Sequence, residues 1–261
     1  MTSSTATPAP QTRQVPPLGG FNLTALRLEV RRVLRNRRTL IFILIFPTVF
    51  FLLFGLPNKN EQLGGQSAIA YIMISMAVYG AMVGTTSGGA AVAVERSMGW
   101  SRQLRLTPLR PVAYVLMKLV TAMVLGLIAV AVVFVVGALS GVRMPAHVWL
   151  LSGLAAWLCS LVFAAFGLFM GFLLPSENVM QFVGPLLAVL AAFGGIFVPL
   201  EVFSHTLQSI AKFTPVYGVG VIARSPLVGG FTATALANVL IWTALFGIGA
   251  MRLFRRDTAR V

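Results

Sequence analysis

Cysteine, histidine and acidic residues are scarce in this sequence: one Cys, two His and six Asp or Glu occur among 261 residues. The lone Cys159 lies within an apolar run, so neither a disulfide framework nor a cysteine-based metal site can form. His147 and His205 are far apart in the sequence, and a metal site needs several converging ligands. We therefore expect no metal and no cofactor to be bound by this chain.

Charged residues of any kind are also few, at 10% of the chain, whereas hydrophobic residues make up 57%. The mean hydropathy of +0.89 is typical of a polytopic membrane protein and excludes a water-soluble one. Six apolar runs are each near or above the ~20 residues that a helix needs to cross hydrocarbon. Their approximate ranges are 39–56, 67–94, 111–139, 148–174, 179–200 and 232–254. Because the runs do not alternate in polarity, we predict an all-α polytopic fold with six transmembrane helices in one domain, 39–254.

The motifs that supply catalysis or energy are missing as well. No H-E-x-x-H, G-x-S-x-G or G-x-x-x-x-G-K-[ST] pattern occurs, and no Asp, Glu, Lys or Arg lies deep within an apolar run. Ion-coupled transporters usually keep ionisable groups near the membrane midplane, so a secondary transporter is disfavoured. The chain is not predicted to be an enzyme, and any active work must draw its energy from another polypeptide.

The formal net charge of +14 has a topological explanation. If the N-terminus is cytoplasmic and the six runs alternate across the bilayer, most Lys and Arg residues are cytoplasmic. The exceptions are Lys59, Arg143, Lys212 and Arg224. This is the positive-inside asymmetry, so we expect a multi-pass plasma-membrane protein with both termini in the cytoplasm and no nucleic-acid partner.

Both ends of the chain are expected to lie on the cytoplasmic side. Residues 1–20 are rich in Ser, Thr and Pro and are predicted to form a disordered tail, not a cleaved signal. Residues 21–38 combine Leu and Val at helical spacing with arginines on another face, which predicts an amphipathic helix in the membrane interface. A positively charged stop beside the first run is an equally good explanation. Residues 255–261 are predicted to form a basic tail.

A basic insert, ERSMGWSRQLRLTPLRP, interrupts the apolar runs from Glu95 to Pro111. Apolar side chains four apart and cations three apart predict a short helix with an apolar side and a basic side, bounded by a glycine and a proline. Such a helix is suited to contact a soluble motor domain, although an ordinary basic inner loop would share its composition. The residues assigned to this contact are Glu95, Arg96, Gly99, Trp100, Arg102, Leu104, Arg105 and Pro108.

Three glycines, Gly80, Gly84 and Gly88, form a ridge at four-residue spacing in the second run. Such a ridge lets a neighbouring helix approach closely. General packing explains it, and a seam that slides during a transport cycle is the alternative.

Taken together, several patterns resemble the ABC type-2 permease family, the membrane subunits of ATP-binding-cassette exporters. One is E-R-x-x-G-x-x-x-x-L-R-x-T-P-L from Glu95 to Leu109, followed by Lys118 at the opening of the third run. Another is G-G-I-F-V-P-L followed by I-A-K-F-T-P-V-Y, between Gly194 and Tyr217. The order and spacing of these patterns extend the resemblance over nearly the whole chain.

The resemblance implies two permease subunits, expected as a homodimer, with two cytoplasmic ATPase subunits that bind ATP and Mg. It implies that Glu95–Pro108 is a cytoplasmic coupling helix that docks on the ATPase. It also implies an outer re-entrant helical hairpin between the fifth and sixth spans, from Phe197 to Ser225. The hairpin residues singled out are Gly195, Pro199, Pro215 and Tyr217.

The function expected from these features is outward movement of a hydrophobic or amphiphilic substrate, such as a drug, antibiotic or lipid-like molecule, driven by ATP hydrolysis on the partner. A glycan or lipid-linked polysaccharide exporter of the same family is an alternative. So is a membrane scaffold or sensor subunit that transports nothing. A passive channel is less favoured, because the runs lack a polar lining.

Overall fold

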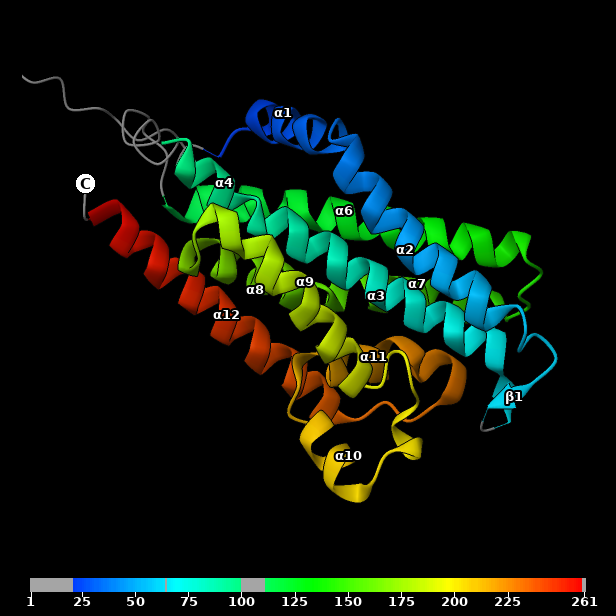
Figure 1. Ribbon diagram of the computed structural model, residues 1–261. Helices are drawn as coiled ribbons and strands as arrows, with labels where there is room; N and C mark the ends of the chain where they lie inside the picture. Colours follow the sequence, from blue (N-terminus) through cyan, green and yellow to red (C-terminus); the bar gives the residue numbers. More distant parts are fainter. Residues whose placement is uncertain (1–20, 64, 100–110, 260–261) are drawn as a thin grey trace, which may run out of the picture.

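The computed structural model describes residues 21–63, 65–99 and 111–259 of a predominantly helical protein (Figure 1). Six helical segments in this part are long and apolar enough to cross a membrane: Arg37–Gly55, Ala68–Ser97, Val112–Leu139, Ala146–Leu173, Ser176–Phe193 and Ala233–Asp257. The class predicted from the apolar runs, a polytopic helical membrane protein with six candidate spans, is therefore confirmed.

The helices before the insert are α1 (Leu23–Leu34), α2 (Arg37–Gly55), α3 (Ala68–Ala90) and α4 (Val92–Ser97). After it come α6 (Pro111–Leu139), α7 (Ala146–Cys159), α8 (Leu161–Leu173), α9 (Ser176–Phe193), the 3-10 helix η2 (Leu200–Val202), α10 (His205–Ala211), α11 (Pro215–Val228) and α12 (Ala233–Ala259). Two short strands, β1 (Gln62–Leu63) and β2 (Gln66–Ser67), pair antiparallel between α2 and α3.

Asparagine caps divide the amphipathic segment expected at 21–38. The Asn22 side chain accepts a hydrogen bond from the backbone N–H of Thr24 at 2.8 Å, which starts α1. The Asn36 side chain caps α2 in the same way, through the N–H of Thr39 at 3.4 Å. Arg37 and Arg38 therefore open the first candidate span instead of ending α1.

Helix α3 is the centre of the bundle. Nearly all of its residues are buried, and it packs against α2, α6 and α8 along its length. Small side chains on α3 let these neighbours approach closely. Because α3 is buried on all sides, its sequence shows little amphipathic pattern. By contrast, α2, α9 and α12 leave many large apolar side chains exposed, as is usual for helices that face lipid.

The fourth candidate span has a one-residue break at Ser160, between α7 and α8. The Ser160 hydroxyl donates to the backbone carbonyl of Trp157 at 2.6 Å. This local hydrogen bond accompanies the break within the apolar run expected to be continuous from 148 to 174. The two helices still form one candidate span, Ala146–Leu173.

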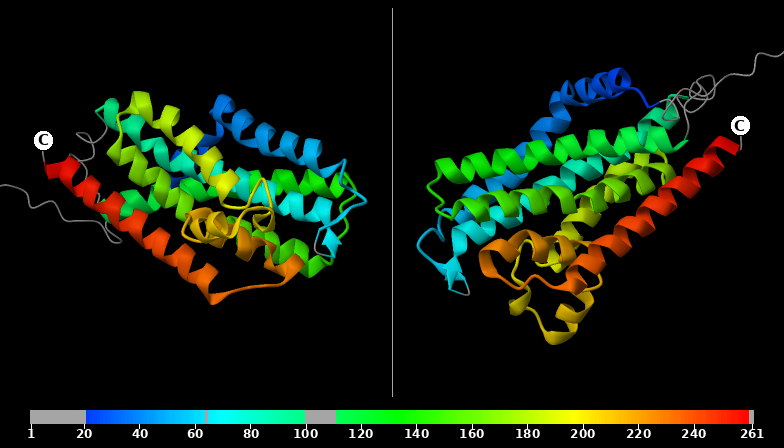
Figure 2. Two further views of the ribbon diagram at one scale, coloured as in Figure 1. Left: turned by 60° about the horizontal axis from the view of Figure 1, so that its bottom comes forward. Right: turned by 180° about the vertical axis from the view of Figure 1, so that it is seen from behind.

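The bundle has two distinct ends, which the views in Figures 1 and 2 show consistently. At the basic end lie α1, α4 and the C-terminal part of α12. At the hairpin end lie the β1–β2 pair, η2, α10 and α11. Helix α12 continues to Ala259, so residues 255–259 of the expected C-terminal tail extend the last helix.

Candidate functional site

Helix α4 is the last part of the second candidate span, and residues 95–97 at its end begin the basic insert. Gly99, beyond its end, has φ of +74°, a conformation that glycine adopts without strain. Five residues assigned to the coupling helix lie outside the described residues: Trp100, Arg102, Leu104, Arg105 and Pro108. Of the other three assigned residues, Glu95 and Arg96 lie on α4 and Gly99 follows its end.

Glu95 is at the centre of a partly buried cluster of charges. Its carboxylate contacts the ammonium of Lys118 on α6 and the guanidinium of Arg32 on α1. The hydroxyl of Tyr114 donates to the second carboxylate oxygen of Glu95 at 2.8 Å. Glu29 of α1 completes the cluster by contacting both Lys118 and Arg32. Three helices, α1, α4 and α6, are therefore joined by one network.

The side chain of Glu95 is only 4% exposed, so its carboxylate acts within this chain instead of lying on a surface open to a partner. Burial alone lowers the pKa of the Arg32 guanidinium, but the hydrogen bonds and charges of Glu95 and Glu29 outweigh this effect and raise it above its ordinary value. Arg32 therefore remains a cation at any physiological pH.

Arg96, the next residue, makes its contacts with a different group of helices. Its Nε and Nη2 donate to the two carboxylate oxygens of Asp257 on α12, each at 2.9 Å. Its Nη1 donates to the backbone carbonyls of Gly171 and Phe172 near the end of α8, at 3.0 and 2.9 Å. These carbonyls belong to the last turn of α8, where no N–H of the same helix can pair with them. Glu95 and Arg96 together tie α4 to α1 and α6 on one side and to α8 and α12 on the other.

In this structure the glycine ridge of α3 faces α2 and α6. A methyl group added at Gly80 would lie 3.2 Å from Cγ of Pro47 in α2, and one added at Gly88 would lie 2.8 Å from Cα of Ala122 in α6. A second and closer seam lies between α3 and α8. A methyl group at Gly89 would lie 2.6 Å from the carbonyl oxygen of Ala164. The four-residue spacing of Gly80, Gly84 and Gly88 did not reveal this second seam, because Gly89 lies on a different face of α3.

The residues singled out in the region before the last span lie at its turns. Gly195 has φ of +80°, Pro199 precedes η2, and Pro215 is the first residue of α11. Proline suits a first helical position because its fixed φ is helical and its missing N–H would have had no helical partner. Tyr217 lies in the first turn of α11 and lines a cavity together with residues of η2 and α10.

Arg224 lies in α11 of the segment expected on the outer side, and it is only 5% exposed within the protein. Its Nη1 donates to the Ser75 hydroxyl on α3 at 3.1 Å and to the carbonyl of Gly195 at 2.9 Å. Its Cζ lies 4.8 Å from the ring centroid of Tyr71. A sequence signal existed, since Arg224 follows an apolar stretch, VYGVGVIA, and Tyr71 and Ser75 are four apart on one face of α3.

Clusters of metal-ligand residue types do not occur in the described ranges, where no three His, Cys, Asp or Glu side chains converge. The acidic residues of the basic end instead pair with cations. These ion pairs are suited to hold the helices of the basic end together, and their charged groups pair with one another instead of with a ligand.

Six candidate spans and a charged connection between the second and third define the chain as a multi-pass membrane protein. Residues 22–228 match the ABC-2 type transporter family, and the chain belongs to this family. It is similar to a Bacillus subtilis (strain 168) protein named "Putative transport permease YvfS", with 29% identity over 218 residues, 83% of this chain and 88% of that protein. The chain is accordingly a membrane subunit of an ABC transporter, which associates with a separate ATP-binding subunit and is not itself the ATPase.

Proposed function

We propose that this chain is the permease subunit of an ABC exporter, which moves a hydrophobic or amphiphilic substrate outward with energy from two cytoplasmic ATPase subunits. The permease acts as a homodimer in this proposal. Family membership supports the transporter role.

The observation that carries the proposal is the double attachment of α4. Glu95 pairs with α1 and α6 whereas Arg96 pairs with α8 and α12, and the rest of the basic insert follows directly. A force applied to the insert by an ATPase would reach both groups of helices through these contacts. Coupling also requires that the ATPase hold the insert differently in its two states, because a ligand shifts an equilibrium only by its differential affinity.

The proposed orientation places the basic end in the cytoplasm and the hairpin end outside. The arginines of α1 and of the end of α12 support this orientation through the positive-inside rule. In this orientation, the insert is on the same side as the ATP that its partner consumes.

Charge reversal within the insert tests the coupling role. Arg102→Glu combined with Arg105→Glu should reduce co-purification with the ATPase or abolish substrate-stimulated ATP hydrolysis in proteoliposomes. Arg143→Glu, at an exposed position in the loop before α7, is the matched control and should behave as the unmodified chain. Normal assembly and normal coupled export by the double variant would refute the assignment.

A non-transporting scaffold is the alternative that this experiment also addresses. A scaffold would bind the ATPase without making its hydrolysis depend on any transported molecule. Substrate-stimulated hydrolysis together with accumulation of substrate inside inverted vesicles is expected for the exporter. Cross-linking and mass measurement of the detergent-solubilised complex would test the proposed pair of permeases.

A further inference from the structure

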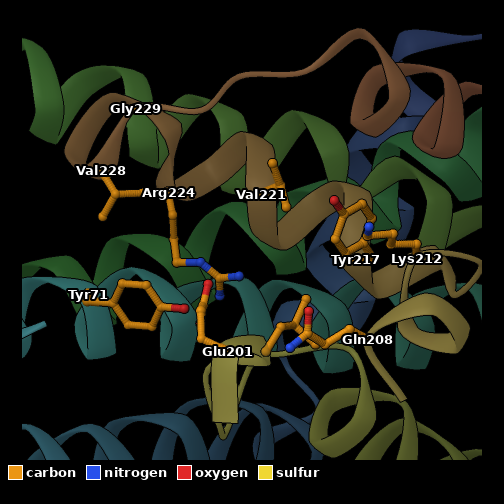
Figure 3. A pocket seen from close by; sticks show the side chains of 10 residues that line it. Tyr71, Glu201, Gln208, Lys212, Tyr217, Val221, Arg224, Val228 and Gly229 are labelled. Carbon is orange, nitrogen blue, oxygen red and sulfur yellow. The ribbon is translucent and has the colours of Figure 1, made fainter. Parts of the chain in front are cut away.

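A small cavity at the hairpin end is bounded by α3, η2, α10 and α11, and Figure 3 shows its lining side chains. Its volume is about 260 Å³. Tyr71 of α3, Glu201 of η2, Tyr217 and Arg224 of α11, and Lys212 directly after α10 contribute side chains to its lining. A cavity of this size is below the range of drug-sized pockets and fits a polar head group with a few waters.

Arg224 lies at the inner wall of this cavity, over the ring of Tyr71, and the carboxylate of Glu201 attracts its charge without forming an ion pair with it. A guanidinium stays protonated in proteins, and burying a charge is costly unless it is paired. Among the described residues, no carboxylate lies at ion-pair distance from Arg224, and its Nε and Nη2 have no hydrogen-bond partner. The Ser75 hydroxyl and the Gly195 carbonyl are neutral acceptors and engage only Nη1.

The residues that line the cavity carry one more positive charge than negative charge. Arg224 and Lys212 are cations, and Glu201 on η2 is the one carboxylate among the lining residues. Glu201 is exposed, so water screens it more strongly than it screens the buried guanidinium. The hydroxyls of Tyr71 and Tyr217 have no hydrogen-bond partner among the described residues and add two donors. A ligand with a single negative charge would balance the charges of the lining residues.

A larger apolar cavity of about 580 Å³ adjoins the first. Phe50 and Phe54 of α2, Ile72 of α3 and Phe197 contribute to its walls. Tyr71 lines both cavities, and Ser75, which accepts the hydrogen bond from Arg224, lines the larger one. The guanidinium therefore lies where the polar and the apolar cavities meet.

We propose that the hairpin end binds an amphiphile with one anionic group, whose anion pairs with Arg224 and Lys212 and whose apolar part occupies the larger cavity. This inference rests on the proposed function and names its substrate class. A cationic amphiphile is the competing class, because Glu61 lines the larger cavity. Glu61 is exposed, however, and an exposed carboxylate attracts a cation much more weakly than a buried, unpaired guanidinium attracts an anion.

Direct binding of matched probes tests the proposal. The full chain in lipid nanodiscs is titrated with radiolabelled laurate, and acetate, dodecanol and dodecyltrimethylammonium are used as competitors. Laurate should bind saturably, and the neutral and cationic twelve-carbon probes should compete at least tenfold less well. Acetate, which carries the anion without the chain, should compete at least a hundredfold less well.

Three variants locate the site. Arg224→Gln and Lys212→Glu should each weaken laurate binding at least tenfold, through loss or reversal of a cation. Val202→Trp should weaken it by narrowing the larger cavity, whose wall includes this residue. Lys212 and Val202 are both exposed, so their substitution leaves the core intact even if Arg224→Gln fails to fold. Arg143→Glu and Val135→Trp, exposed substitutions outside both cavities, should bind laurate as the unmodified chain does.

Two results would overturn the proposal. Equal binding of laurate and dodecyltrimethylammonium, or unchanged laurate binding by Lys212→Glu and Val202→Trp, would show that the charge and the cavity do not select the ligand. Competition by acetate as strong as that by laurate would show a site for a free anion and remove the amphiphile. Because binding is measured without the ATPase, it is independent of coupling: failure of export with selective laurate binding would refute the exporter and leave the site.

Discussion

Arg96 and Asp257 are 161 positions apart in the chain, yet they form a two-pronged ion pair in which both N–O distances are 2.9 Å. The pair joins α4, where the basic insert begins, to α12, the last helix of the bundle. Both side chains are partly exposed, at 27% and 30%, so solvent screening limits what the charges contribute. The pair matters more for its geometry than for its energy, because the planar guanidinium of Arg96 meets the planar carboxylate of Asp257 and fixes their relative orientation.

Arg96→Lys keeps the positive charge but removes the planar guanidinium, so it measures what the guanidinium geometry contributes. A lysine cannot donate at once to both Asp257 oxygens and to the two α8 carbonyls that Arg96 also contacts. We expect a loss of about 1 kcal/mol in the free energy of unfolding, or about 2–4 °C in Tm for a chain of this size. Thermal unfolding in nanodiscs measures it. Asp257→Asn is the companion variant, and a double-mutant cycle should show the two effects to be less than additive.

The buried members of the charged cluster, Glu95 and Lys118, should show a similar non-additivity. Glu95→Gln leaves Lys118 with Glu29, and Lys118→Met leaves Glu95 with Arg32 and Tyr114. Because each single variant keeps a buried charge with fewer partners, each should destabilise the fold by about 2–3 kcal/mol. The double variant should lose less than the sum of the two losses. Strictly additive losses in Tm measurements would show that the two groups do not interact.

Tyr114→Phe isolates one hydrogen bond of the same cluster. The variant removes the donor to Glu95 but keeps the aromatic ring, which stacks on Phe254 with centroids 5.5 Å apart. A hydrogen bond to a charged acceptor contributes about 1.5–3 kcal/mol, so a decrease of that order in the free energy of unfolding is expected. Tyr79→Phe serves as the control, because the Tyr79 hydroxyl makes no hydrogen bond to a described residue. Equal Tm values for the two variants would contradict the assigned hydrogen bond.

Alanine should have opposite effects at Gly89, in the seam between α3 and α8, and at Gly247, on an open face of α12. Gly89→Ala would place a methyl group 2.6 Å from the Ala164 oxygen and from the Leu168 nitrogen, so backbone must shift at a cost of about 3 kcal/mol or more. Gly247→Ala meets nothing within 4 Å and should stabilise α12 by about 0.5–1 kcal/mol, since alanine loses less conformational freedom in a helix. Expression level and Tm by fluorescence-detected gel filtration would report both. A tolerated alanine at position 89 would mean that this seam is loose.

Local features of the sequence identified much of the architecture. The number of candidate spans follows from hydropathy, because each span must satisfy its own backbone within a single apolar stretch. The spacing of apolar residues did not predict where one helix ends and the next begins. Single side-chain hydrogen bonds accompany the break at Ser160 and the division of residues 21–38 at Asn36, and hydropathy does not reveal them.

The charged residues show most clearly what the sequence determined by itself and what required the tertiary structure. The absence of a phosphate loop and the basic insert of ERSMGWSRQLRLTPLRP already indicated a permease that takes its energy from a partner. Only packing decided that Glu95 and Arg96 bind to opposite groups of helices and that Arg224 is buried beside α3. Hydropathy is a property of neighbouring residues, whereas the pairing of charges depends on which distant helices pack together.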